Sequence, residues 1–179
     1  SDDRSRYERF LAAYRQAEPP RWDTGIVPPE VRALAEGPDP LPAGRALDVG
    51  CGTGSLLAAV LERVSPACTG SAALHLAPSW CGAVGLDRSV PMLGEARGRM
   101  PGLAAICADA AHLPLLGGSF DVVIGAFFLH HVAPAARPEV IRECRRVLCP
   151  GGRVVIVLAR TSISFGLARF FPEVVELDR

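Results

Sequence analysis

A glycine-rich turn between two apolar runs constrains this 179-residue chain more than any other feature of its sequence. Its glycines stand at alternate positions, Gly50, Gly52 and Gly54, and Asp48 precedes the first of them by two residues. Glycine lets a backbone turn tightly and approach a ligand closely, because it carries no Cβ. The pattern predicts a strand, a ligand-binding turn and a helix at the carboxyl edge of an open parallel sheet.

The glycine spacing separates the ligands that such turns bind. A dinucleotide-binding turn has glycines at its first, third and sixth positions, whereas here the sixth position is Ser55. No Gly-Lys-Ser/Thr follows, and the chain has no lysine, which excludes a phosphate-binding P-loop. The turn instead resembles the first motif of the class I S-adenosylmethionine-dependent methyltransferases, where it wraps the amino-acid part of the cofactor.

Later segments follow the order of the same family. Residues 83–87 are expected to form a second strand that ends in Asp87, a carboxylate placed to accept hydrogen bonds from ribose hydroxyls. Ser89 is expected to cap the next helix, with a proline in its first turn. The remaining expected elements are a third strand leading to an acidic turn over 103–110, a fourth strand over 120–125, a turn over 148–153 and a fifth strand over 154–159.

The resemblance, over residues 46–159, implies a three-layer α/β Rossmann-like open sheet, mainly parallel, with strand order 3-2-1-4-5. After the fifth strand we expect a helix near 163–171 and one strand over 173–177. The usual C-terminal antiparallel strands would then be absent or truncated, and we interpret the chain as truncated. We assign residues 1–40 to a helical lid, 41–179 to the cofactor domain and about 65–82 to a surface insertion.

The resemblance also implies a cofactor site for S-adenosylmethionine and its product, S-adenosylhomocysteine. In the family, the residue matching Asp109 accepts a hydrogen bond from the adenine amino group, and the N–H matching Ala110 donates one to the ring. Each aspartate has a second interpretation, because aspartate commonly caps helices and orients turns. The residues expected to contact the cofactor are Asp48, Gly50, Cys51, Gly52, Gly54, Asp87, Arg88, Met92, Asp109, Ala110 and Ala126.

Residues 125–132 follow the expected fourth strand and should lie beside the transferred methyl group. Transfer from a sulfonium is an in-line displacement, so the protein chiefly aligns the acceptor and excludes water. His130 and His131 are candidate general bases, since imidazole titrates near neutrality; the alternative is that they begin and pack the next helix. The candidate acceptor or lid contacts are Tyr7, Tyr14, Trp22 and Phe127.

The same segment limits the classes of molecule that could accept the methyl group. It lacks the proline pair found in enzymes that methylate amino groups of DNA bases or of protein glutamine. It also lacks the Pro-Cys nucleophile of the cytosine C5 methyltransferases. Its apolar residues favour a small organic acceptor, and residues 109–132 resemble a group that includes quinone-biosynthesis methyltransferases. We therefore predict a small-molecule methyltransferase. The alternatives are a non-catalytic module that binds S-adenosylmethionine or S-adenosylhomocysteine, and a nicotinamide-dependent dehydrogenase, which Ser55 disfavours.

The amino-acid composition limits the classes of partner and the cellular compartment that we expect for this chain. The chain balances 19 basic against 19 acidic residues without a dense basic run, which argues against nucleic acid as a partner. We expect a cytoplasmic protein without a signal segment or a membrane span. The six cysteines show no metal-binding spacing, so we expect no metal and mostly buried thiols. A homodimer through an exposed sheet edge is a further expectation.

Overall fold

The computed structural model describes residues 44–54, 83–101 and 103–158, the backbone of 159–164 and 167–178, and single positions before residue 44. The expected lid over 1–40 lies almost wholly outside these residues, and the expected insertion over 65–82 lies entirely outside them. The division of the chain into these segments therefore stays a prediction.

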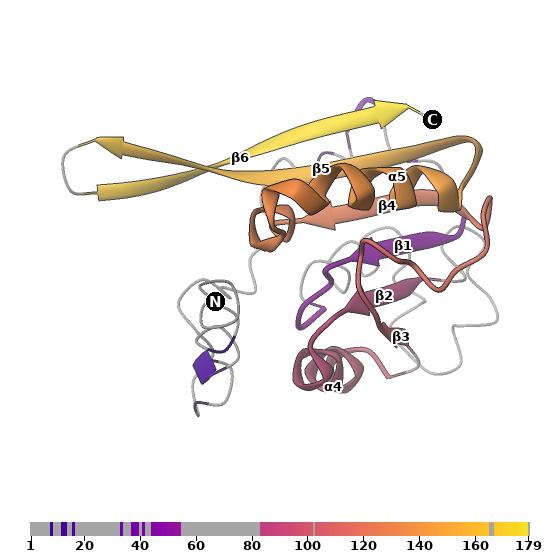
Figure 1. Cartoon of the computed structure of the whole chain (residues 1–179), viewed down its shortest axis with the longest axis horizontal. Helices are drawn as coiled ribbons and strands as arrows, with labels where there is room; N and C mark the ends of the chain where they lie inside the picture. Colours follow the sequence, from indigo (N-terminus) through magenta and orange to yellow (C-terminus); the bar gives the residue numbers. More distant parts are fainter. Residues whose placement is uncertain are drawn as a thin grey trace.

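A single twisted sheet forms the centre of the described structure (Figure 1). Its strand order is β3-β2-β1-β4-β5-β6, which confirms the predicted order of the first five strands. These five strands pair in parallel, and β6 pairs antiparallel with β5. The strands are β1 (Ala46–Val49), β2 (Val84–Asp87), β3 (Ala104–Cys107), β4 (Phe120–Ala126), β5 (Leu148–Ser164) and β6 (Leu167–Asp178).

Among the described residues, two α-helices lie in the connections between neighbouring parallel strands. Helix α4 (Val90–Arg99) lies beside β2 and β3, and helix α5 (Arg137–Val147) crosses in front of β4 and β5 (Figure 1). The second helix buries Val140, Cys144 and Val147, which are spaced by four and three residues and so share one face. Between β4 and α5 the chain forms two short 3₁₀ helices, η3 (Leu129–His131) and η4 (Pro134–Ala136).

Central strands of this sheet are buried on both faces, as the continuous apolar runs in the sequence predict. All four residues of β1 are buried, and so are residues 154–157 of β5. The expected turn over 148–153 is instead a wide irregularity inside β5: Leu148 pairs with Phe120, and the next registered pair is Arg153 with Val122. Gly151, with φ 79°, lies within it.

The predicted helix near 163–171 is wrong. Strand β5 runs on to Ser164, and β6 begins at Leu167 and pairs with it over twelve registered positions. The sequence here is rich in β-branched and aromatic residues, which favour strands over helices. The expected strand over 173–177 lies within β6, so one antiparallel C-terminal strand is present.

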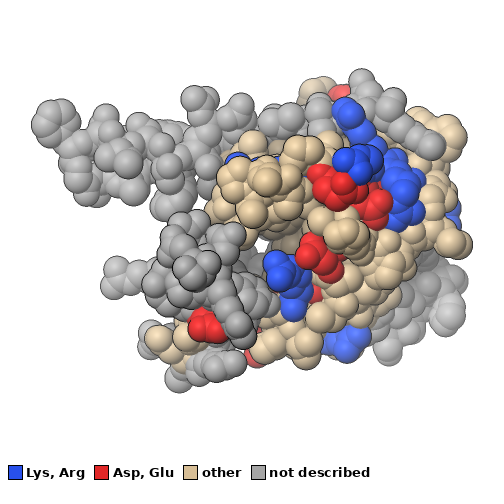
Figure 2. Space-filling view, viewed as in Figure 1, with Lys and Arg blue, Asp and Glu red and all other residues tan. Residues whose placement is uncertain are grey.

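Charges of both signs are interspersed on the visible face of the described residues (Figure 2). Helix α5 carries two acidic–basic pairs, Glu139 with Arg142 and Glu143 with Arg146. In the part of the chain that is described, no helix is long and apolar enough to cross a membrane.

Candidate functional site

The glycine turn after β1 is built as its sequence predicts. Gly50, Gly52 and Gly54 have φ values of 73°, 54° and 73°, a backbone region that favours glycine. The N–H groups of Gly50 and Cys51 both donate to the carbonyl of Leu86, at 2.7 and 3.0 Å. These two bonds tie the turn to the end of β2, and so bring two of the expected cofactor segments together.

Asp87 joins the turn to helix α4. Its Oδ2 accepts the Gly52 N–H at 3.0 Å, and its Oδ1 accepts the Ser89 N–H at 2.8 Å. Burial raises the pKa of this carboxyl, while the Ser89 and Gly52 N–H groups and the charge of His131 act in the opposite direction. Asp87 thus orients the glycine turn and also bonds to the residue that begins helix α4, which is compatible with the alternative interpretation of Asp87 as a cap. Each oxygen keeps a further lone pair for a ribose hydroxyl.

Asp48 lies beneath the turn and is 2% exposed. Among the described residues, neither of its carboxylate oxygens has a hydrogen-bond partner. Burial and then the nearby Asp87 raise the pKa of Asp48 to about 7. The expected alternative, that Asp48 orients turn amides, is therefore not what the described contacts show. A buried carboxylate without a partner is a costly arrangement that a cationic ligand would relieve.

Other expected cofactor residues lie around this centre. A Cβ on Gly52 would come within 3.3 Å of the Met92 Cε, so the turn packs against the first turn of α4. The Cys51 side chain is buried, whereas Arg88 is exposed. The acidic turn after β3 is linked to the centre by the Ala108 N–H, which donates to the Asp87 carbonyl at 3.1 Å. Beyond it, the Asp109 carboxylate accepts the Ala111 N–H at 2.9 Å, and Ala110 is buried.

The end of β4 contains a strained residue. Phe127 has φ 56°, a left-handed conformation that bulky side chains rarely adopt. Its N–H donates to the Val157 carbonyl at 2.8 Å, which helps to hold that conformation. Strain of this kind gathers at functional sites, where the surrounding structure maintains it. Phe127 and the preceding Ala126 are both partly exposed at this edge of the sheet.

Phe128 is a residue of the site that the sequence interpretation missed. A Cβ built on Gly50 would lie 2.3 Å from the Phe128 Cβ, and one built on Gly125 would lie 2.3 Å from its Cε1. The Phe128 ring, 9% exposed, thus fills a notch between the ends of β1 and β4. Only the two glycines hint at this notch in the sequence, and they do not say which side chain fills it.

The two candidate bases lie next to each other. His130 and His131 form the end of η3, with ring centroids 4.0 Å apart. Desolvation, then the charges of His131 and Arg137, lower the pKa of His130 to about 4, so this imidazole is neutral at pH 7. The positions of Tyr7, Tyr14 and Trp22 lie outside the described residues.

Metal binding finds no support in the described side chains. No group of three or more His, Cys, Asp or Glu residues among them could hold a metal ion. Of the six cysteines, Cys51 and Cys144 are buried free thiols, Cys149 is partly exposed and Cys107 is exposed. Cys107 donates to the Arg88 carbonyl at 3.6 Å, which places it at the end of β3 beside the candidate site.

Comparison with known proteins assigns the family. The sequence pattern of the methyltransferase-domain family matches residues 65–156, just over half of the chain. This chain belongs to the class I S-adenosylmethionine-dependent methyltransferases. The matched range begins after the glycine turn. The geometry of that turn is therefore an observation separate from the match, and both agree with a methyltransferase cofactor site.

Similar proteins include two with named acceptors. The demethylmenaquinone methyltransferase of Beutenbergia cavernae is 40% identical over 88 residues, 49% of this chain and 36% of that protein. The malonyl-[acyl-carrier protein] O-methyltransferase of Marinomonas sp. is 33% identical over 112 residues, 61% of this chain and 36% of that protein. The chain thus spans about a third of the length of these two methyltransferases.

A solved structure agrees with the fold. It comes from work on the conversion of a disulfide bond into a thioacetal group during echinomycin biosynthesis. It has a TM-score of 0.65 and 27% identity, and covers 84% of this chain and 59% of that chain. This likeness extends over more of the chain than the family pattern does.

Proposed function

We propose that the protein transfers a methyl group from S-adenosylmethionine to a small organic acceptor, with the cofactor held at the carboxyl ends of β1, β2 and β3. The observation that carries the proposal is the buried Asp48 carboxylate, which is unpartnered among the described residues and lies in β1, two residues before the glycine turn. S-adenosylmethionine carries an ammonium and a sulfonium, and either positive charge would stabilise an ionised Asp48.

The other ends of the cofactor have matching groups in this chain. Asp87 would accept the ribose hydroxyls with the lone pairs that its two backbone bonds leave unused. The turn at Asp109 and Ala110 would hold the adenine ring, next to the Ala108–Asp87 bond that fixes the distance between the two aspartates. The residues present therefore fit a ligand with a cationic, a dihydroxy and an aromatic portion.

The bound cofactor would supply an electrophilic methyl group on its sulfonium. The chain's own contribution would be to align the acceptor and to exclude water along the end of β4, where Ala126 and the strained Phe127 lie. His130, with a pKa of about 4, is neutral at pH 7 but a weak base. It would suit an acceptor whose proton is easily lost, and alignment would dominate catalysis.

The acceptor class rests on the end of β4 and on the two named relatives. The acceptors named for these two relatives, demethylmenaquinone and a malonyl thioester, are organic groups and not nucleic acids. The partly exposed Ala126 and Phe127 offer an apolar surface to such acceptors. No observation on the described residues favours the non-catalytic alternative. A hydroquinone and a malonyl thioester are therefore the first acceptors to test.

Titration calorimetry tests the cofactor. S-adenosylmethionine and S-adenosylhomocysteine should bind, while NAD and ATP should give no heat. Asp87→Ala should lower the affinity for both binding ligands by roughly 2–4 kcal/mol, because it removes charge-assisted hydrogen bonds. The 2′-deoxyribose analogue of S-adenosylhomocysteine should bind the wild type more weakly but lose less in Asp87→Ala. Tighter binding of NAD than of S-adenosylmethionine would overturn the proposal.

Mass spectrometry tests the transfer. Incubation of the protein with S-adenosylmethionine and each acceptor should yield an acceptor in which a methyl group replaces one hydrogen, a mass gain of one CH2, together with S-adenosylhomocysteine and a released proton. Cofactor binding without product from any acceptor in a broad panel would favour the non-catalytic module instead.

A further inference from the structure

The loop that follows the acidic turn is fastened to that turn by local hydrogen bonds. The Ala111 N–H donates to the Asp109 carboxylate at 2.9 Å, and the His112 N–H donates to the Asp109 carbonyl at 3.0 Å. Leu113 comes next, and its side chain is buried in the core. A displacement of Leu113 would therefore be transmitted through one short turn to Asp109.

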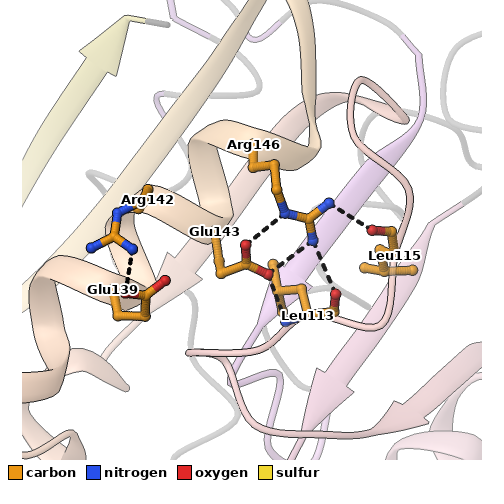
Figure 3. Close-up of polar contacts among 6 residues, drawn as sticks. All are labelled: Leu113, Leu115, Glu139, Arg142, Glu143 and Arg146. Carbon is orange, nitrogen blue, oxygen red and sulfur yellow. Dashed lines mark hydrogen bonds and ion pairs between the residues drawn. The ribbon is translucent and has the colours of Figure 1, made fainter.

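Two side chains of helix α5 bind the backbone N–H and the backbone carbonyl of Leu113 (Figure 3). The Leu113 N–H donates to the Glu143 Oε2 at 2.8 Å, and the Leu113 carbonyl accepts from an Arg146 NH2 group at 3.0 Å. Arg146 also donates from Nη1 to the Leu115 carbonyl at 2.9 Å. The pair thus gives this loop the hydrogen bonds that a neighbouring strand would otherwise supply.

The two side chains also fix each other. The Arg146 Nε donates to Glu143 Oε1 at 2.6 Å, and its NH2 group donates to Oε2 at 2.8 Å, a two-pronged charge-assisted contact. A planar guanidinium can make all of these bonds at once, whereas a lysine ammonium cannot match that fork. The last residues of the loop are held by the same end of α5, because the Gly118 N–H donates to the Arg146 carbonyl at 3.1 Å.

We propose that the Glu143–Arg146 pair positions the acidic turn at Asp109 and thereby sets how tightly, and how selectively, the adenine end of the cofactor is held. This inference rests on the proposed function. Glu143 and Arg146 are both positioning residues: they act through Leu113 and the Asp109 turn and do not themselves contact the ligand.

The same helix offers a matched control. Glu139 and Arg142 form an ion pair of the same residue types at the same spacing, one turn earlier (Figure 3). Their side chains are 35% and 69% exposed, against 14% and 39% for Glu143 and Arg146. Within the described part of the chain, the Glu139–Arg142 pair makes no hydrogen bond to the loop after Asp109.

The test compares Arg146→Lys with Arg142→Lys by titration calorimetry. The two ligands are S-adenosylhomocysteine and S-inosylhomocysteine, which lacks the purine amino group. Wild type should prefer the adenine ligand. Arg146→Lys should bind S-adenosylhomocysteine about tenfold more weakly and lose most of that preference, because Asp109 is no longer placed to accept from the amino group. Arg142→Lys should keep both the affinity and the preference.

Hydrogen exchange supplies a readout that needs no ligand. The amides of residues 111–113 should exchange faster in Arg146→Lys than in wild type, and at the wild-type rate in Arg142→Lys. Glu143→Gln replaces Arg146→Lys if the latter does not fold, and should give the same two results, because the neutral amide weakens the contact with Arg146.

The possible outcomes are distinct. An Arg146→Lys protein that weakens both ligands equally and keeps the wild-type preference would overturn the inference, as would unchanged amide exchange. Wild-type protein that binds neither ligand would instead refute the proposed function. In that case, faster exchange in Arg146→Lys would still show that the pair orders the turn, and unchanged exchange would refute that as well.

Discussion

Asp48 occupies the environment least suited to its charge among the described residues of the site. It is 2% exposed, and its pKa is raised to about 7 by burial and by Asp87. The unfolded chain would release this proton near the ordinary value of 3.8. Between these two values the folded protein holds a proton that the unfolded chain has lost, so the free energy of unfolding falls as the pH rises through this window.

Asp48→Asn should therefore stabilise the protein at neutral and alkaline pH. The expected gain at pH 8 is at most about 4 kcal/mol, because the pKa of Asp48 rises from 3.8 in the unfolded chain to about 7 in the folded protein. Below pH 4 the two proteins should have similar stability, because Asp48 is then protonated in both states. Urea unfolding at several pH values measures this difference. Equal pH profiles for the two proteins would show that the Asp48 carboxylate is not desolvated in the folded state.

Asp121, near the amino end of β4, provides a control because its pKa is shifted in the opposite direction. It accepts the Arg45 N–H at 2.7 Å and the Cys149 thiol at 3.2 Å, and these bonds lower its pKa. Its contribution to stability is thus complete above the ordinary pKa near 3.8 and is lost as the pH falls below it. Asp121→Asn should lower the free energy of unfolding by a constant amount above about pH 4 and by less as the pH falls further, so it should leave the slope of stability against pH in the neutral range unchanged.

At the scale of the element, helix α4 begins inside the site. Ser89 is its N-cap and is 1% exposed, and its side chain accepts the Met92 N–H at 3.4 Å. The Ser89 N–H donates to Asp87, so one residue both starts the helix and fixes the carboxylate. These two bonds differ in one respect: the first needs the serine side chain, and the second needs only its backbone.

Ser89→Ala should separate the two roles. Loss of the cap should lower the free energy of unfolding by about 1 kcal/mol, while the backbone bond to Asp87 persists and affinity for S-adenosylhomocysteine stays within about twofold of wild type. Chemical denaturation and titration calorimetry on the same samples provide both numbers. A larger loss of affinity than of stability would mean that the hydroxyl itself contributes to the ligand site.

The elements that could be predicted from the sequence are those with local signals. The glycine turn, the Ser89 cap and the central strands follow from residue types at fixed spacing, and the structure contains each of them. The helix expected near 163–171 was wrong because the β-branched and aromatic residues of this segment favour a strand, which β6 forms by pairing with β5. The Phe128 notch and the Glu143–Arg146 contacts join segments far apart in sequence, and no local pattern reveals such contacts.

At the scale of the whole molecule, the parallel sheet gathers the site from distant segments. Parallel strands end on the same side of the sheet (Figure 1). The turn after β1, Asp87 at the end of β2, the Asp109 turn after β3 and Phe127 after β4 therefore share its carboxyl edge. A ligand bound there touches several strands at once. Its binding free energy therefore adds to the stability of the whole sheet.

S-adenosylhomocysteine at about 100 times its dissociation constant should raise the free energy of unfolding by about 2.7 kcal/mol. For a chain of this length the melting temperature should rise by roughly 5–10 °C. NAD at the same concentration should cause no shift. Differential scanning calorimetry makes the comparison, and a shift confined to NAD would contradict the assigned site.

The notch around Phe128 has a consequence for how this sequence can diverge. Gly50 and Gly125 leave equally little room for a side chain, but Gly50 also has φ 73°, while the backbone of Gly125 lies outside that region. Position 50 is therefore fixed by backbone conformation as well as by space, and a smaller residue at 128 would not free it. Position 125 is limited by space alone, and it can accept a small side chain once position 128 becomes smaller and the Ile156 Cδ1, 3.2 Å from the added Cβ, shifts slightly. Descendants of this sequence should thus change 125 and 128 as a pair and retain glycine at 50.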